Sequence, residues 1–253
     1  MTTDKSSSRP GTASAIARSF DIYYRDLERV RRMDALHAAL MPPGGLAFDI
    51  GAHVGDRTAS FLRRGSAVVA LEPDPHVFRA LRLLYGRAPG VTLVRAAAGA
   101  EAGVASMYLN RSNPTVSTLS RRLVDASPND PAWQDQVWDD RSSVRVVTLD
   151  GLIATHGRPD FAKIDVEGFE AKVLHGLSTP LPLLSFEVTM LCREVAYACL
   201  DRLSDLGRYV YNLSLGEEHR LRFPDWQDEQ ALRAEISRLP MSANSGDVYA
   251  RLR

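Results

Sequence analysis

Charged residues stand at alternate positions in one short stretch of the chain, KIDVEGFE. In a β-strand Lys163, Asp165 and Glu167 would share one side, and Ile164 and Val166 the other. A charged side on an internal strand is costly to bury unless it meets a ligand, a metal or water. The carboxylates could act as a general base or orient a substrate hydroxyl, and the amine could pair with them or bind the substrate. We therefore predict Asp165, Glu167 and Lys163 as catalytic residues; the alternative is a structural set of ion pairs at the sheet edge.

A further carboxylate, Glu187, is expected near the end of the next strand. Because adjacent strand ends meet at one edge of a sheet, Asp165 and Glu187 could together hold a divalent cation, and carboxylate oxygens suit magnesium. No spacing in the sequence demands a metal, and none is predicted. Glu170, in the helix that follows, is expected to be a solvated residue.

A second group of candidate residues lies in the loop DIGAHVGDRT, which follows the first predicted strand. Gly51 lets the chain turn sharply, and Gly55 lets the next helix begin close to a ligand. The amino end of that helix would favour a carboxylate. Glu72, at the end of the second strand and 23 residues after Asp49, is placed to accept both hydrogens of a ribose diol. Together these features indicate an adenosine-containing cofactor.

The spacing Asp-x-Gly-x-x-x-Gly narrows the choice of cofactor. It lacks the G-x-G-x-x-G that brings a backbone against a pyrophosphate, and neither a Walker A loop nor a Tyr-x-x-x-Lys arrangement occurs in the chain. A ligand with a ribose and a carboxylate but no phosphate fits best, which describes S-adenosylmethionine. The alternative is that the glycines merely make a turn.

The elements that must position these residues alternate in type. Strand-like runs and helical runs follow one another from residue 45, which is the pattern of a parallel sheet with right-handed crossovers. Strands are expected at 45–50, 67–72, 91–97, 104–110 (in a hairpin), 144–149, 160–166, 182–188, 208–214 and 247–252, and helices at 55–65, 75–86, 192–206 and 227–239.

The chain is expected to divide into a disordered leader (1–12), an N-terminal helical extension (13–44) and one domain (45–253). Within the domain, the polar segment 111–143 is too long for an ordinary connection and is predicted to be a substrate lid. Its tryptophans, Trp133 and Trp138, could cover a substrate or simply anchor the loop.

Composition excludes several classes of protein. Lysines and arginines (31) balance aspartates and glutamates (31), so nothing points to nucleic acid. Cys192 and Cys199 are expected to be free buried thiols in a reducing compartment, and no apolar run has the length of a membrane span. We expect a cytoplasmic protein, and the N-terminal helical extension could serve a homodimer.

Five segments resemble, in order, those of FkbM-type methyltransferases: FDIGAHVGDRT, ALEPD, AAAGAEAG, VRVVTLD and KIDVEGFE. These are class I S-adenosylmethionine-dependent enzymes, most of them O-methyltransferases, and the similarity covers roughly residues 45–190. It implies a Rossmann-like α/β fold, with a mostly parallel seven-stranded sheet, an antiparallel last strand and helices on both faces. One departure is His53, where the family more often has asparagine.

The resemblance also implies roles for individual residues. Asp49, Gly51 and Gly55 would cradle the methionine moiety, with His53 in the same loop, and Glu72 would hold the ribose. Ala97 and Ala98 would border the adenine, and Asp165 would lie beside the methyl group. The implied function is methyl transfer from S-adenosylmethionine to a hydroxyl of a small-molecule acceptor, a sugar or glycan, or a natural product. A nucleotide-dependent (NAD-type) oxidoreductase and a non-catalytic binding protein that retains the fold are the alternatives.

Overall fold

The computed structural model describes residues 11–253, and the leader predicted for 1–12 lies almost entirely outside the described residues. Two helices come first, α1 (Thr12–Arg25) and α2 (Leu27–Leu40). Asp26 separates them and caps α2, because its side chain accepts a hydrogen bond from the backbone N–H of Arg29. The predicted helical extension is therefore a helix pair.

A seven-stranded sheet forms the centre of the molecule, in the order β3-β2-β1-β7-β8-β10-β9. The first five of these strands are parallel, and β10 pairs antiparallel with both β8 and β9. This confirms the predicted mostly parallel sheet with an antiparallel last strand. The bounds are β1 (Leu46–Ile50), β2 (Ala67–Leu71), β3 (Val91–Val94), β7 (Phe161–Ile164), β8 (Leu183–Thr189), β9 (Tyr209–Leu215) and β10 (Ser245–Leu252).

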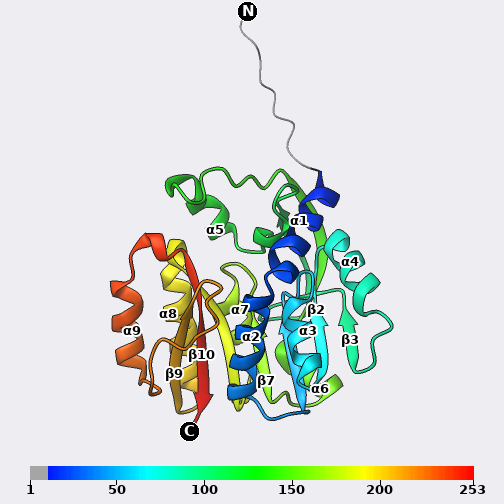
Figure 1. Ribbon diagram of the computed structural model, residues 1–253. Helices are drawn as coiled ribbons and strands as arrows, with labels where there is room; N and C mark the ends of the chain where they lie inside the picture. Colours follow the sequence, from blue (N-terminus) through cyan, green and yellow to red (C-terminus); the bar gives the residue numbers. More distant parts are fainter. Residues whose placement is uncertain (1–10) are drawn as a thin grey trace, which may run out of the picture.

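Helices cover both faces of this sheet (Figure 1). One apolar core joins Ala47, Phe161 and Tyr249 of the strands to α2, α3 (Asp56–Arg63) and α4 (Pro75–Tyr85). On the other face lie α6 (Leu149–His156), α7 (Glu170–His175), α8 (Arg193–Leu206) and α9 (Glu229–Arg238). Across residues 11–253, no helix combines the length and apolar character needed to span a membrane.

A second, three-stranded sheet corrects one prediction and accounts for another. Residues 91–97 were expected to form one strand, but β3 ends at Val94, and β4 (Ala97–Ala98) pairs instead with β6 (Asp140–Val147). The strand expected at 104–110 is β5 (Gly103–Leu109), which pairs antiparallel with the next strand, β6, through the long connection 110–139. An apolar pattern predicts a strand, but the choice of sheet depends on pairing between distant segments.

The connection between β5 and β6 contains one helix, α5 (Arg121–Ala126), between two 3₁₀ turns, η1 (Pro114–Val116) and η2 (Ser127–Asn129). Both tryptophans anchor it, because Trp133 Nε1 donates to Asn244 Oδ1 (3.1 Å) and Trp138 Nε1 donates to the carbonyl of Val116 (2.8 Å). Figure 1 shows α5 and α1 at the same end of the sheet. Two further 3₁₀ turns, η3 (Met190–Cys192) and η4 (Met241–Ala243), complete the elements.

A buried ion-pair network attaches the N-terminal helices to the domain. Arg29 on α2 is 3% exposed, and its guanidinium donates to Asp56 Oδ2 (2.7 Å) and Glu217 Oε2 (2.8 Å). Arg57 pairs with the same two carboxylates. Because Asp56 begins α3 and Glu217 follows β9, this network joins three parts of the chain that are far apart in sequence.

We predict that Arg29→Ala lowers the free energy of unfolding by about 3 kcal/mol, the lower end of the range for breaking a buried ion pair. The loss stays at this lower end because Arg57 still neutralises part of the charge of Asp56 and Glu217. The matched control is Arg31→Ala on the same helix, whose pair with Glu28 is exposed and should contribute less than about 1 kcal/mol. Urea unfolding followed by circular dichroism measures both values. Equal losses in the two variants would contradict this role of Arg29.

Candidate functional site

A row of polar side chains crosses the carboxyl ends of the central strands. Asp49 is the register partner of Lys163, and Asp247 is the partner of Glu187. By strand alternation these residues lie on the face that carries Phe161 and the N-terminal helices, near the carboxyl ends of β1, β7 and β8 and the amino end of the antiparallel β10. This edge of the sheet therefore carries charged side chains although the N-terminal helices cover it.

Lys163 neutralises part of this row. Its side chain is 3% exposed, and Nζ donates to Asp165 Oδ2 (3.0 Å) and Asp247 Oδ1 (2.7 Å). Burial alone would lower the pKa of Lys163, but the charges of Asp165 and Asp247 outweigh it and hold that pKa well above its usual value. Lys163 thus stays charged and links β7 to β10.

The segment after Lys163 differs from the predicted strand. β7 ends at Ile164, and Glu167 takes a left-handed backbone conformation (φ 57°), so it reaches the site through a turn and not through strand alternation. Glu170, expected to be solvated, is buried (1% exposed). Its carboxylate accepts hydrogen bonds from the N–H groups of Val166 (3.0 Å) and Gly168 (3.2 Å), so it supports this turn.

The glycine loop between β1 and α3 approaches that turn closely. Gly51 has φ 87°, and a Cβ placed there would lie 1.8 Å from the carbonyl oxygen of Asp165. Gly55 also has a positive φ, but its Cβ would point at Tyr85 of α4. Asp49 accepts a hydrogen bond from Thr58 Oγ1 (2.6 Å), and burial raises its pKa to about 6. The loop is thus held in place by its close approach to the turn after β7, by its packing against α4 and by the hydrogen bond of Thr58.

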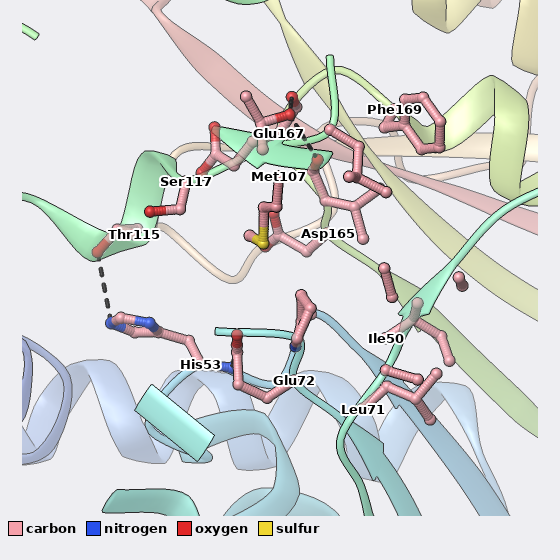
Figure 2. Close-up of a pocket in the computed structure, with 18 of the residues that line it drawn as sticks. Ile50, His53, Leu71, Glu72, Met107, Thr115, Ser117, Asp165, Glu167 and Phe169 are labelled. Carbon is pink, nitrogen blue, oxygen red and sulfur yellow. Dashed lines mark hydrogen bonds between the residues drawn. The ribbon is translucent and has the colours of Figure 1, made fainter. Parts of the chain in front are cut away.

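One cavity lies over β1, β2 and the small sheet (Figure 2). Its polar group on the β2 side is Glu72, whose Oε2 accepts from the N–H of His53 (3.0 Å) and whose Oε1 accepts from the N–H of Asp74 (2.8 Å). Burial raises the pKa of Glu72 to about 8. The walls are mostly apolar and include Ile50, Leu71, Ala97, Ala98, Met107 and Phe169. Apolar walls with a carboxylate that two backbone N–H groups hold in place suit a nucleoside.

A second cavity lies beside the first and is strongly charged. Six carboxylates line it, against the two cations Arg57 and Lys163. The two cavities have in common Gly51, His53, Thr115, Asp165 and Glu167. These five residues therefore mark the place where a ligand in one cavity would meet a ligand in the other.

Three carboxylates converge at this junction. Asp165, Glu167 and Glu187 each offer one oxygen, and these three oxygens lie within 4.8 Å of one another. Burial, followed by the charges of neighbouring carboxylates, raises the pKa of Glu167 and of Glu187 well above the usual range.

His53 connects the covering elements above the junction. Its Nε2 lies 2.9 Å from Ser19 Oγ on α1 and 3.4 Å from Thr115 Oγ1 in η1, the latter contact being dashed in Figure 2. Burial lowers the pKa of His53 to about 4, so the ring is neutral at pH 7. Because both contacts use the same ring nitrogen, Ser19, His53 and Thr115 form one shared hydrogen-bonding set.

Most of the residues predicted for the site do line the two cavities, whereas Gly55 lines neither. Sequence reasoning missed Arg57, Glu217 and Tyr23, which line the second cavity, and Asp247, which pairs with Lys163. Arg57 belongs to the quoted loop DIGAHVGDRT, so its position in the sequence could have identified it. Glu217 and Tyr23 come from segments without a motif, so no local signal identifies them. The residues of the prediction that do line a cavity are Asp49, Gly51, His53, Glu72, Ala97, Lys163, Asp165 and Glu167.

Comparison with known proteins identifies one family and several solved structures of low similarity. A family model described as the methyltransferase FkbM domain matches residues 49–198. A TehB-like SAM-dependent methyltransferase from Corynebacterium glutamicum is 11% identical, over 95% of this chain and 100% of that one, with a TM-score of 0.47. An O-methyltransferase from Bacillus cereus in complex with SAH is 10% identical, over 95% and 91%, with a TM-score of 0.46. No curated protein matches the chain.

We predict that Gly51→Ala costs about 2–5 kcal/mol of unfolding free energy, because a Cβ adds left-handed strain and overlaps the Asp165 carbonyl. The matched control is Gly103→Ala, where nothing lies within 4 Å of the added Cβ and the change should stay within about 0.5 kcal/mol. Chemical denaturation measures both variants. An unchanged stability in Gly51→Ala would show that the loop and the turn do not approach as described.

Proposed function

The chain belongs to the FkbM family of methyltransferases, whose model matches more than half of its length, and on that basis we propose that it methylates a hydroxyl group of a sugar, glycan or natural product. The observation that carries this proposal is the pair of adjoining cavities, one apolar with Glu72 and one lined by carboxylates. They meet at Asp165 and Glu167, so a cofactor and an acceptor could approach each other there.

The residues of the first cavity fit S-adenosylmethionine, the cofactor of this family, which supplies an electrophilic methyl group when bound. We assign Glu72 to the ribose hydroxyls, because its carboxylate lines the cavity and both of its oxygens are already oriented by backbone N–H groups. Ala97 and Ala98 border the position of the adenine, and Asp49, Gly51 and His53 that of the methionine end. We assign Gly55 a structural role only, because it packs against α4.

The second cavity suits an acceptor with several hydroxyl groups, because ionised carboxylates accept hydrogen bonds from hydroxyls. Asp165 is the residue that we assign to orienting the reacting hydroxyl and taking its proton, with Glu167 beside it. Lys163 contributes by holding Asp165 in place through its ion pair. Fixing the acceptor oxygen in this way supplies much of the catalysis in a methyl transfer.

Segment 111–143 is proposed as the lid of this site. Thr115 lines both cavities, and Val116 and Trp133 line the second. Trp133 also ties the segment to Asn244, across the acceptor cavity. A cover of this kind keeps water away from the reacting groups.

Location and assembly are proposed on separate observations. Cys192 and Cys199 are buried free thiols, which fits a reducing compartment such as the cytoplasm. Ile22 and Leu27 are more than half exposed at the junction of α1 and α2, so this helix pair offers an apolar surface to a second copy of the chain.

Glu72→Gln is predicted to weaken S-adenosylmethionine binding about ten- to a hundredfold, the range expected for charged hydrogen bonds. The ribose hydroxyls favour the ionised carboxylate, and the pKa of Glu72 is about 8 in the protein without cofactor. The affinity of the unaltered protein for S-adenosylmethionine should therefore rise with pH up to about 8 and then level off. The variant should lose this dependence. Calorimetric titration from pH 6 to 9 tests it, with the exposed Glu101→Gln as control; an identical pH profile in Glu72→Gln would refute the assignment.

The proposed function itself is tested by calorimetry followed by turnover. S-adenosylmethionine and its demethylated product should bind, and NADH should not; binding of NADH alone would restore the oxidoreductase alternative. In an acceptor screen that begins with sugars, Asp165→Asn should lower turnover at least about 100-fold while largely sparing cofactor binding. Asp225→Asn, at an exposed position, is the control. Full activity in Asp165→Asn would show that the proton acceptor lies elsewhere, and cofactor binding with no turnover on any acceptor would favour a binding protein.

A further inference from the structure

The three converging carboxylates at the junction of the cavities are short of positive charge. Lys163 is engaged by Asp165 and Asp247, and Arg57 by Asp56 and Glu217. Within residues 11–253, no arginine, lysine or histidine forms an ion pair with Glu167 or Glu187. The cluster therefore has three acidic groups and one shared amine.

The side chain of Glu167 provides a second, independent observation. It is only 9% exposed and lines both cavities. In the described part of the chain its carboxylate accepts no hydrogen bond, although its backbone carbonyl accepts one from Thr118 Oγ1 (2.7 Å). A buried carboxylate without a donor is costly, so its persistence at a cavity wall indicates a ligand that supplies positive charge.

Glu187 shows the same deficiency to a lesser degree. Its one hydrogen bond within the described residues is a long contact of 3.4 Å from Thr189 Oγ1. The Glu187 carboxylate comes from β8, that of Asp165 from the end of β7, and that of Glu167 from the turn after β7. Three different backbone positions thus bring one oxygen each within 4.8 Å of the others, close enough for one cation to contact all three.

We propose that Asp165, Glu167 and Glu187 bind one divalent cation of the magnesium class. A set made only of oxygen ligands selects a hard cation, and magnesium typically uses a few carboxylates while keeping other positions for water or substrate. Here the other positions face the acceptor cavity, which is lined by the same three residues. The cation site does not depend on the proposed function. The further role of the cation, which is to hold two neighbouring hydroxyl oxygens of the acceptor, does rest on that function.

Metal binding is measured on the full chain, after chelation and without acceptor. Titration with Mn²⁺, followed by electron paramagnetic resonance, should show one site per chain that Mg²⁺ displaces. Glu187→Gln and Glu167→Gln should each weaken Mn²⁺ at least about tenfold, whereas Asp205→Asn, at an exposed position, should leave it unchanged. Circular dichroism and cofactor titration establish that the variants are folded. Absence of a Mn²⁺ site in the unaltered protein, or a site that both glutamine variants retain, overturns the proposal.

Turnover then separates this inference from the proposed function. Loss of methyl transfer on chelation and its recovery with Mg²⁺ support a cation that positions the acceptor. Full turnover in the presence of chelator overturns that role and leaves the methyltransferase function standing; a protonated amine of the acceptor would then be the partner of the carboxylates. A Mn²⁺ site in a protein that methylates no acceptor supports the cation and counts against the proposed function alone.

Discussion

The ion pair that Lys163 makes with Asp165 and Asp247 is the interaction on which the site depends. Parallel strands bring their carboxyl ends to one edge, and this chain places acidic residues at several of those ends, where covering helices exclude water. One buried amine compensates two of the acids and joins strands that lie 84 positions apart in the chain. The remaining acids, Glu167 and Glu187, stay available to ligands.

A steric constraint sets the shape of the same region. The glycine loop can approach the turn after β7 only because Gly51 has no side chain toward the Asp165 carbonyl. Gly51 and Asp165 are also among the few residues that line both the apolar and the charged cavity. Glu170, buried beneath the turn, satisfies two backbone N–H groups that would otherwise lack partners. The junction is therefore built mainly from backbone geometry, and its carboxylates are carried on that frame.

The cover over the junction comes from parts of the chain outside the core strand-helix units. Tyr23 lies on α1, Thr115 in the insert, and Glu217 and Asn244 in the loops around β9 and β10. Arg29 of α2 holds the first of these parts, because its guanidinium donates to the carbonyl of Tyr23 (3.1 Å), and tryptophan hydrogen bonds hold the second. Because the proposed cofactor residues belong to the core and not to this cover, differences in acceptor would be expressed in the cover.

The sequence by itself determined the sheet and the edge at which the candidate site residues meet. Alternating strands and helices require parallel strands, and parallel strands bring Asp49, Glu72 and Asp165 to one edge. Tertiary structure alone decided the burial of Glu170 and the contribution of Glu217. It also decided that residues 91–97 divide between two sheets. The physical reason is range: periodicity and glycine spacing act within a few residues, whereas burial, ion pairing and choice of sheet depend on segments that meet only in the folded chain.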